Sequence, residues 1–374
     1  GRSVIAGYPW FSDWGRDTMI SLPGLTLATG RPEVARAILS TFARHVDQGM
    51  LPNYFPDHGE QPEYNTVDAA LWLFQAVRAY HEATGDDAFL LETFPVLEEI
   101  LAWYERGTRW GIQVDPEDGL VRQGAPGVQL TWMDARVDDW VVTPREGKPV
   151  EINALWYSAL VTMAGFAHRL KRPPETLLAC AERVADGFAR FWNGEAGCLY
   201  DVLDGPQGAD PKIRPNQIFA ASLPESPLPP ARRKAVVDTC GRLLVTSHGL
   251  RSLAPGDPAY RGTFVGDRHA RDGAYHQGTV WTWLLPHFAI AHERVYGDRA
   301  TALGFLEPMG RLLAAMGVGT LPEVADGDPP HAPRGCLAQA WSVAEVLRAY
   351  HALSSEPKRP RRRNVPRTAM AMAR

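Results

Sequence analysis

One acidic residue stands where its surroundings could tune it for proton transfer. Asp134 ends the run Thr-Trp-Met-Asp at 131–134, and Trp132 and Met133 directly precede it. Partial burial against these side chains would raise the pKa of the carboxyl group and keep a proton available near neutral pH. Asp134 is therefore the candidate general acid. Asp138 and Asp139 follow closely and compete for the role.

A second carboxylate follows far along the chain. Glu323 lies in the run LPEVADGD at 321–328, after a Gly-rich segment. Two carboxyl groups over an aromatic-lined pocket suit glycoside hydrolysis, in which one protonates the leaving oxygen and the other activates water or attacks carbon. A separation of about 6.5–9.5 Å would give inversion and one of about 5–5.5 Å retention. The sequence predicts the pair and leaves their separation open.

The segment 8–17, YPWFSDWGRD, carries candidate binding residues. Arg16 beside Asp17 offers fixed donors and acceptors for neighbouring sugar hydroxyls. A helix cap with a local ion pair would explain Asp17 alone, but it would not explain Asp13 and the aromatic residues around it. Trp10, in a polar loop, is typical of a flat binding platform.

Two further polar segments precede apolar, helix-like stretches. Asp68 follows Asn65 and Thr66 at the start of a predicted helix. Helix capping and the helix dipole explain an acidic residue at this position as well as sugar binding does. His276 and Gln277 stand in DGAYHQG at 272–278 and supply hydrogen-bonding groups. A lone histidine is more often structural, and no metal-ligand spacing is present.

The apolar residues recur at helical spacing almost throughout the chain. Residues 31–48, 67–84, 86–107, 152–171, 174–192, 215–222, 230–244, 278–296, 299–316 and 337–353 are predicted helices, and 18–29 is a weaker one. Helices apolar all round alternate with amphipathic ones, which predicts an inner ring of helices inside an outer ring. Long loops would gather at one end and build a pocket. An α-solenoid binding protein is the alternative, but its repeats would keep more constant lengths.

Composition narrows the class of protein. The 374 residues carry a net charge of −4, so the overall charge does not favour nucleic-acid binding. No apolar run is long enough to span a membrane as a helix. Four scattered cysteines form no CxxC pair; they fit a reducing compartment, although two disulfides remain an alternative.

We expect one domain over residues 1–355 and a basic, solvated tail over 356–374. Because the chain starts at Gly1 rather than Met, it is expected to be a fragment or a processed chain.

Several ordered motifs resemble one known family. The runs GYPWFSDWGRDTMISLPGL, YNTVDAALW, TWMDAR, PVEINALWYSAL, IRPNQIFAASLP, YHQGTVWTWL and DGDPPHAPRGCLAQAWSVAEVLRAY are similar to the C-terminal glucosidase domain of glycogen debranching enzymes, the amylo-α-1,6-glucosidase family. The resemblance covers nearly all of the chain. It implies an all-α (α/α)6 toroid related to glucoamylase, a cytoplasmic enzyme without cofactor or metal, and inverting release of the glucose left at an α-1,6 branch stub of glycogen.

The resemblance also assigns roles to residues. It implies Asp134 as general acid, Glu323 as general base, and Arg16 with Asp17 as the pair that holds the nonreducing glucose. The other residues that it would place around the pocket are Trp10, Asp13, Asp68, Trp132, Glu151, Asn153, Asn216, His276, Gln277 and Trp341. Glu151 is a rival for a catalytic role, or a dipole partner at the start of its helix.

The chain departs from the family pattern in two ways. Related bacterial proteins carry an N-terminal β-rich domain, so we expect a missing upstream domain as a partner, beside the branched α-glucan itself. About eleven helices are predicted where twelve complete the toroid, so one outer helix is expected upstream, in an irregular segment, or missing. Two other functions stay open: another toroid glycosidase of glucoamylase or trehalase type, and a noncatalytic glycan-binding module.

Overall fold

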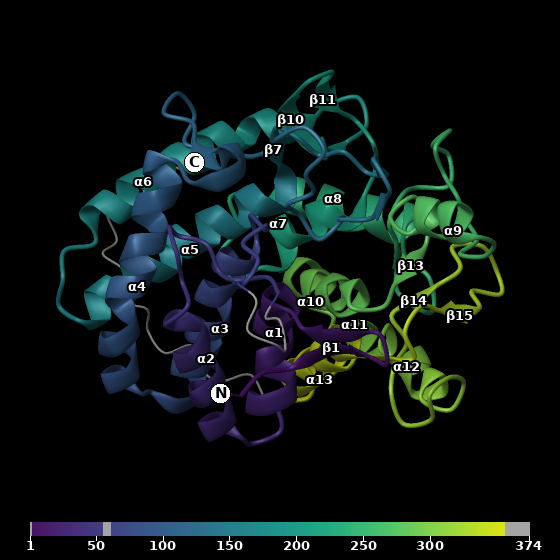
Figure 1. Cartoon of the computed structure of the whole chain (residues 1–374), viewed down its shortest axis with the longest axis horizontal. Helices are drawn as coiled ribbons and strands as arrows, with labels where there is room; N and C mark the ends of the chain where they lie inside the picture. Colours follow the sequence, from purple (N-terminus) through teal and green to yellow (C-terminus); the bar gives the residue numbers. More distant parts are fainter. Residues whose placement is uncertain (1, 55–60, 356–374) are drawn as a thin grey trace.

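The computed structural model describes residues 2–54 and 61–355, and Figure 1 shows their arrangement. The basic tail predicted over 356–374 lies outside the described residues. Helices dominate the part of the chain that the structure describes, and the strands are short. Their bounds are α1 Gly15–Leu22, α2 Pro32–Ala43, α3 Ala69–Thr84, α4 Asp87–Arg106, α5 Val150–Arg169, α6 Glu175–Phe188, α7 Phe219–Ser222, α8 Pro230–Leu243, α9 Arg268–Ala274, α10 Leu284–Tyr296, α11 Arg299–Gly304, α12 Glu307–Leu312 and α13 Ala340–Ser354.

Six helices close a ring. α1 packs against α3 and α13, α3 against α5, α5 against α7, α7 against α10, and α10 against α13. They include α5 and α10, which fall in the two stretches predicted to be apolar all round, and every residue of α1 is buried as well. The prediction of an (α/α)6 toroid is confirmed, since each inner helix except α13 is followed by an outer helix in the described residues: α2, α4, α6, α8 and α11.

The inner helix α1 continues into a π-helical turn at Pro23–Leu27, where Pro23 interrupts the regular backbone. Gly24 lies in this turn against α13, and a Cβ there would come within 1.8 Å of the backbone oxygen of Ala344. Only glycine permits this approach, which helps to close the ring between its first and last helices.

Short strands hold the loops at the ends of the inner helices. One sheet pairs β1 Ile5–Tyr8 with β2 Phe11–Asp13 and β16 Ala338–Gln339, and so joins the two ends of the described chain. A second has the order β12 Leu250–Arg251, β13 Val280–Trp281, β14 Val324–Ala325 and β15 Pro333–Arg334, all antiparallel. Figure 1 shows β13, β14 and β15 beside α9. The remaining pairs are β7 Lys148–Pro149 and β11 Gly208–Asp210 on either side of β10 Val202–Gly205, β3 Gln113–Val114 with β4 Val121–Arg122, β5 Arg136–Val137 with β6 Trp140–Val141, and β8 Trp192–Asn193 with β9 Cys198–Leu199.

Some predicted element bounds were wrong. The helix expected over 278–296 begins at Leu284, because Val280–Trp281 forms β13 between two partner strands. The helix expected over 299–316 is divided into α11 and α12, and α9 lies in a segment predicted to be loop. All four cysteines are free, so the two-disulfide alternative is excluded. No helix among the described residues is long and apolar enough to cross a membrane.

Candidate active site

A small cavity lies at the end of the ring where the inner helices begin. Arg16 and Asp17 are in the first turn of α1, Trp341 is in the first turn of α13, and all three line the cavity. Asp134 and Glu323 line it as well. The toroid therefore brings together the predicted acid, the predicted base and the predicted sugar-binding pair. We call this space, of about 100 Å³, the active-site cavity.

Arg16 is the cation around which the acidic residues gather. Its Nε atom donates to both carboxylate oxygens of Asp68, at 2.8 and 2.9 Å, and its Nη1 atom donates to Oδ2 of Asp134 at 2.9 Å. Arg16 and Asp68 are both almost completely buried. Asp68 does not line the cavity; it holds the guanidinium in a fixed orientation from behind.

Asp134 is ionised more readily than the sequence predicts. Burial opposes ionisation, but His276 and the Arg16 guanidinium outweigh it and hold the pKa of Asp134 below its usual range. The expectation that the surroundings of Trp132 and Met133 would raise this pKa is therefore wrong. The Asp134 side chain keeps 37% of its surface accessible, so it can still reach a ligand in the cavity.

Glu323 titrates near neutral pH. Burial raises the pKa of its carboxyl group to about 7, against two hydrogen bonds that favour the ionised form. The hydroxyl of Tyr275 donates to Oε1, and the backbone N–H of Cys336 donates to Oε2 at 2.9 Å. The strand pairing of β13 with β14 places Glu323 next to Trp281 and near Tyr275.

Asp17 is a second carboxyl group with a raised pKa. Burial raises its pKa to about 7, although Arg16 opposes the shift, and the neighbouring carboxylates of Asp134 and Glu323 add to it. One guanidinium cannot offset four nearby carboxylates. Near neutral pH Asp17 and Glu323 are therefore each partly protonated.

Aromatic rings form the wall behind Asp134. The Trp132 ring meets those of His276, Trp281 and Trp283 edge-on, with centroids 5.2–5.4 Å apart. His276 stacks on Trp281 with centroids 4.9 Å apart. Its Nε2 atom lies 3.9 Å from Oδ1 of Asp134. Burial lowers the pKa of His276, and the Asp134 carboxylate opposes that shift.

Other predicted site residues lie behind this wall. Trp132 donates from Nε1 to Oδ1 of Asn216 at 2.7 Å, and Asn216 donates to Oδ1 of Asp201 at 2.7 Å. Arg145 bridges Asp201 to Glu151 through buried ion pairs. Glu151 is thus part of an ion cluster that supports Trp132, and the structure does not place it on the cavity.

Three more predicted residues have other surroundings. Asn153 is buried and bonds the backbone of Val121 and Pro149, and Gln277 bonds Arg214 and the 142–143 segment. Trp10, in the turn between β1 and β2, is 67% exposed and does not line the cavity. Asp13 is half-buried at the end of β2.

Six residues that line the cavity were not among the predicted site residues: Ala6, Phe11, Trp14, Tyr275, Trp281 and Gln339. Trp14, Tyr275 and Trp281 stand in motifs already singled out, so their aromatic character was a usable signal. The side chain of Cys336 gave no such signal, because Cys336 acts on Glu323 through its backbone N–H. No group of three or more His, Cys, Asp or Glu in the described ranges is arranged to hold a metal ion.

Known proteins resemble this chain along most of its length. A family model described as amylo-alpha-1,6-glucosidase matches residues 1–348. The glycogen debranching enzyme of Saccharomyces cerevisiae is 26% identical over 393 aligned residues, which cover 79% of this chain and 25% of that enzyme. The chain thus spans about a quarter of that relative's length.

Solved structures share the fold at low identity. A GH63 mannosylglycerate hydrolase from Thermus thermophilus superposes with a TM-score of 0.68 at 19% identity, covering 93% of this chain and 96% of that one. An uncharacterized conserved protein from the same organism gives 0.68 at 18% identity, covering 92% and 95%. Both likenesses concern the architecture of the ring.

Proposed function

The chain belongs to the amylo-α-1,6-glucosidase family of glycoside hydrolases, and we propose that it releases glucose from α-1,6 branch stubs of glycogen or a related branched α-glucan with inversion. One observation carries the proposal: Asp134 and Glu323, far apart in sequence, line the same small cavity with Arg16 and Asp17 between aromatic walls. The cavity's modest volume favours one terminal sugar unit over a length of glucan chain.

The side chains divide the chemistry in the following way. Arg16 and Asp17 orient the hydroxyl groups of the terminal glucose. Asp134 protonates the glycosidic oxygen, and Glu323 takes a proton from water that attacks the anomeric carbon from the opposite face. The product is β-glucose. The neighbouring carboxylates stabilise the oxocarbenium-like transition state electrostatically.

The pKa order of the free site shapes this mechanism. Asp134 must carry the proton when the bond breaks, yet its pKa is lowered while that of Glu323 is raised, so Glu323 holds the proton more tightly. The active form is the pair that carries one proton in total, which exists between the two pKa values. A sugar hydroxyl that draws the Nη1 atom of Arg16 away from Asp134 would raise the pKa of Asp134 and favour the productive arrangement.

The whole protein has further expected partners. Because the chain spans about a quarter of the yeast relative, we propose that additional domains accompany it and share in binding the glucan. Four free cysteines support a reducing, cytoplasmic compartment.

A limit dextrin with single α-1,6-glucosyl stubs tests the proposal. Nuclear magnetic resonance of the anomeric protons should show β-glucose first, and α-glucose first would mean retention and a different role for Glu323. Maltose, isomaltose and trehalose measure linkage preference, and faster cleavage of maltose or trehalose would contradict the α-1,6 assignment. No glucose from a folded sample would favour a binding module.

Matched variants test the acid. Asp134→Asn should lower kcat by about 10²–10⁴-fold, the usual contribution of general acid catalysis, while the fold persists. Asp139→Asn is the control, since Asp139 is fully exposed and lies outside the cavity. Equal activity of both variants would refute the role of Asp134.

A further inference from the structure

A second and larger cavity lies at the opposite end of the ring. The later turns of three inner helices line it: α3 through Arg78, α10 through Arg294 and α13 through Arg348. The first turn of α13 lines the active-site cavity through Trp341. Its volume is about 470 Å³, within the range of small-molecule sites. We call it the axial cavity.

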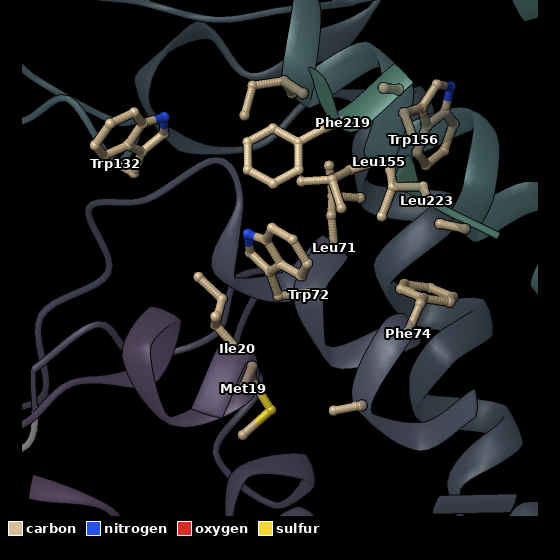
Figure 2. Close-up of a cluster of buried hydrophobic side chains, with 14 of the residues drawn as sticks. Met19, Ile20, Leu71, Trp72, Phe74, Trp132, Leu155, Trp156, Phe219 and Leu223 are labelled. Carbon is tan, nitrogen blue, oxygen red and sulfur yellow. The ribbon is translucent and has the colours of Figure 1, made fainter. Parts of the chain in front are cut away.

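An apolar layer separates the two cavities. Trp72 meets Phe219 edge-on with centroids 5.6 Å apart, and Phe219 lies 5.5 Å from Trp283. Figure 2 shows Trp72 and Phe219 together, with Met19 and Ile20 near Trp72. Met19, Ile20 and Trp72 line the axial cavity and give it an apolar floor.

The charged lining is unbalanced. Four arginines and two glutamates line the axial cavity, Arg78, Arg294, Arg299, Arg348, Glu82 and Glu345, which leaves a net charge of +2 with histidines neutral. Glu345 is already engaged by Arg348 and by His287. Glu82 pairs with Arg78 and is largely exposed, so it offsets little of that charge.

Arg294 caps the end of α7 and lies near two other arginines of the cavity, Arg78 and Arg348. Its Nη1 atom donates to the backbone oxygens of Ser222 and Leu223, where α7 ends. The carboxylates of Glu225 and Glu293 act on it electrostatically, and Glu293 also pairs with Arg299. Burial first, and then the nearby guanidinium groups of Arg348 and Arg78, lower its pKa to about 10 against the effect of those two carboxylates. Capping α7 uses one nitrogen of the guanidinium and does not explain why three arginines converge.

We propose that the axial cavity binds a small phosphate ester, with the phosphate among Arg78, Arg294 and Arg348 and the organic part over the apolar floor. A phosphate monoester carries about −1.5 to −2 charges at pH 7, which matches the net charge of the lining. Guanidinium groups fit phosphate oxygens in fixed geometry. An apolar and aromatic floor with Trp72 suits a sugar ring, and the volume exceeds what inorganic phosphate needs.

The segment that follows Ser355 is an unsuitable occupant on grounds of charge. It contains Lys358, Arg359, Arg361, Arg362, Arg363 and Arg367, the same sign as the cavity lining. Like charges would repel, so the favoured ligand is an anion from outside this segment.

Calorimetric titration of the full chain with glucose 6-phosphate tests the proposal. Saturating glucose is present throughout, so that the active-site cavity does not contribute. We expect saturable binding that weakens with added salt, and weaker binding of inorganic phosphate. Absence of saturable binding at millimolar concentration would overturn the proposal, and inorganic phosphate binding as tightly as the ester would overturn the assignment of an ester.

Three variants locate the site. Arg294→Gln should weaken binding about tenfold or more, since it removes a charge-assisted contact. Arg78→Gln should act in the same direction and decides the outcome if Arg294→Gln fails to fold, because Arg78 bonds Gln75 and Glu82 within its own helix. Arg172→Gln, an exposed arginine paired with Glu98 away from the cavity, is the control. Equal affinity in Arg78→Gln and Arg172→Gln would place the ligand elsewhere.

Discussion

Removing the hydroxyl of Tyr275 should change the pH dependence of activity in a defined direction. This hydroxyl donates to Oε1 of Glu323 and favours its ionised form. A hydrogen bond to a charged group contributes about 1.5–3 kcal/mol, and one pKa unit equals about 1.4 kcal/mol. Tyr275→Phe should therefore raise the pKa of Glu323 by about 1–2 units from its value of about 7.

The direction of the change in the pH profile follows from the single proton that the pair of Asp134 and Glu323 must carry. The singly protonated pair of Asp134 and Glu323 is lost on the alkaline side when Glu323 releases its proton, at about pH 7 in the unmodified site. A higher pKa keeps the proton bound longer, so the alkaline limb of kcat/KM should move to higher pH in Tyr275→Phe. The cavity loses a hydroxyl group as well, so the maximal rate is expected to fall without affecting the position of the limb.

The assay is kcat/KM for glucose release, measured from about pH 4 to 10 to span both sides of the alkaline limb. Tyr80→Phe is the matched control, because Tyr80 is also buried and donates to a carboxylate, Asp86, away from the active-site cavity. Its alkaline limb should stay in place. A limb that does not move in Tyr275→Phe, or that moves to lower pH, would refute the assignment of the titration to Glu323.

Three other changes have expected outcomes. Gly335→Ala should lower kcat strongly, because the new Cβ would lie 2.4 Å from Oε2 of Glu323 and displace that carboxylate. Gly85→Ala is the control: its φ is similar and nothing lies within 4 Å of the new Cβ, so it should lower stability alone. Equal kcat values for the two variants would contradict this prediction. Asp68→Asn should reduce the free energy of unfolding by about 3–5 kcal/mol in denaturant titration, because it leaves buried Arg16 without its full partner. The pKa of Glu345 is lowered to about 2 by Arg348 and His287, which outweigh burial; its ionised form thus contributes stability above about pH 4.5 that is lost as pH falls towards 2. Thermal unfolding should show this loss, and Glu345→Gln should flatten it.

The helices were predictable because their physics is local. A buried inner helix needs apolar residues on all sides, and an outer helix needs one apolar face, so the sequence of α3, α4, α5 and α6 predicts their type and approximate bounds. The start of α10 was not predictable in this way. Residues 280–281 pair with β12 and β14, which come from distant parts of the chain, and those pairings override the local preference for helix.

In the candidate site, too, some features were predictable from the sequence and others only from the structure. Asp134, Glu323, Arg16 and Asp17 were identified from residue types and motifs, and the structure brings them to one cavity. Glu151 stands in an equally suggestive motif, yet it pairs with Arg145 behind the aromatic wall of the active-site cavity. A motif shows that a residue is unusual, but only the folded chain shows whether it faces the cavity or supports it.

The sequence by itself determined the helical class, the alternation of buried and half-exposed helices, and the residue types that could perform acid–base chemistry. The tertiary structure decided their protonation. Arg16 lies 118 residues from Asp134 in sequence and touches it in the fold, which reverses the pKa shift expected from the neighbours of Asp134. Hydrophobic periodicity is encoded within a few helical turns, whereas a pKa depends on every charge within several ångströms, and closure of the ring determines which charges those are.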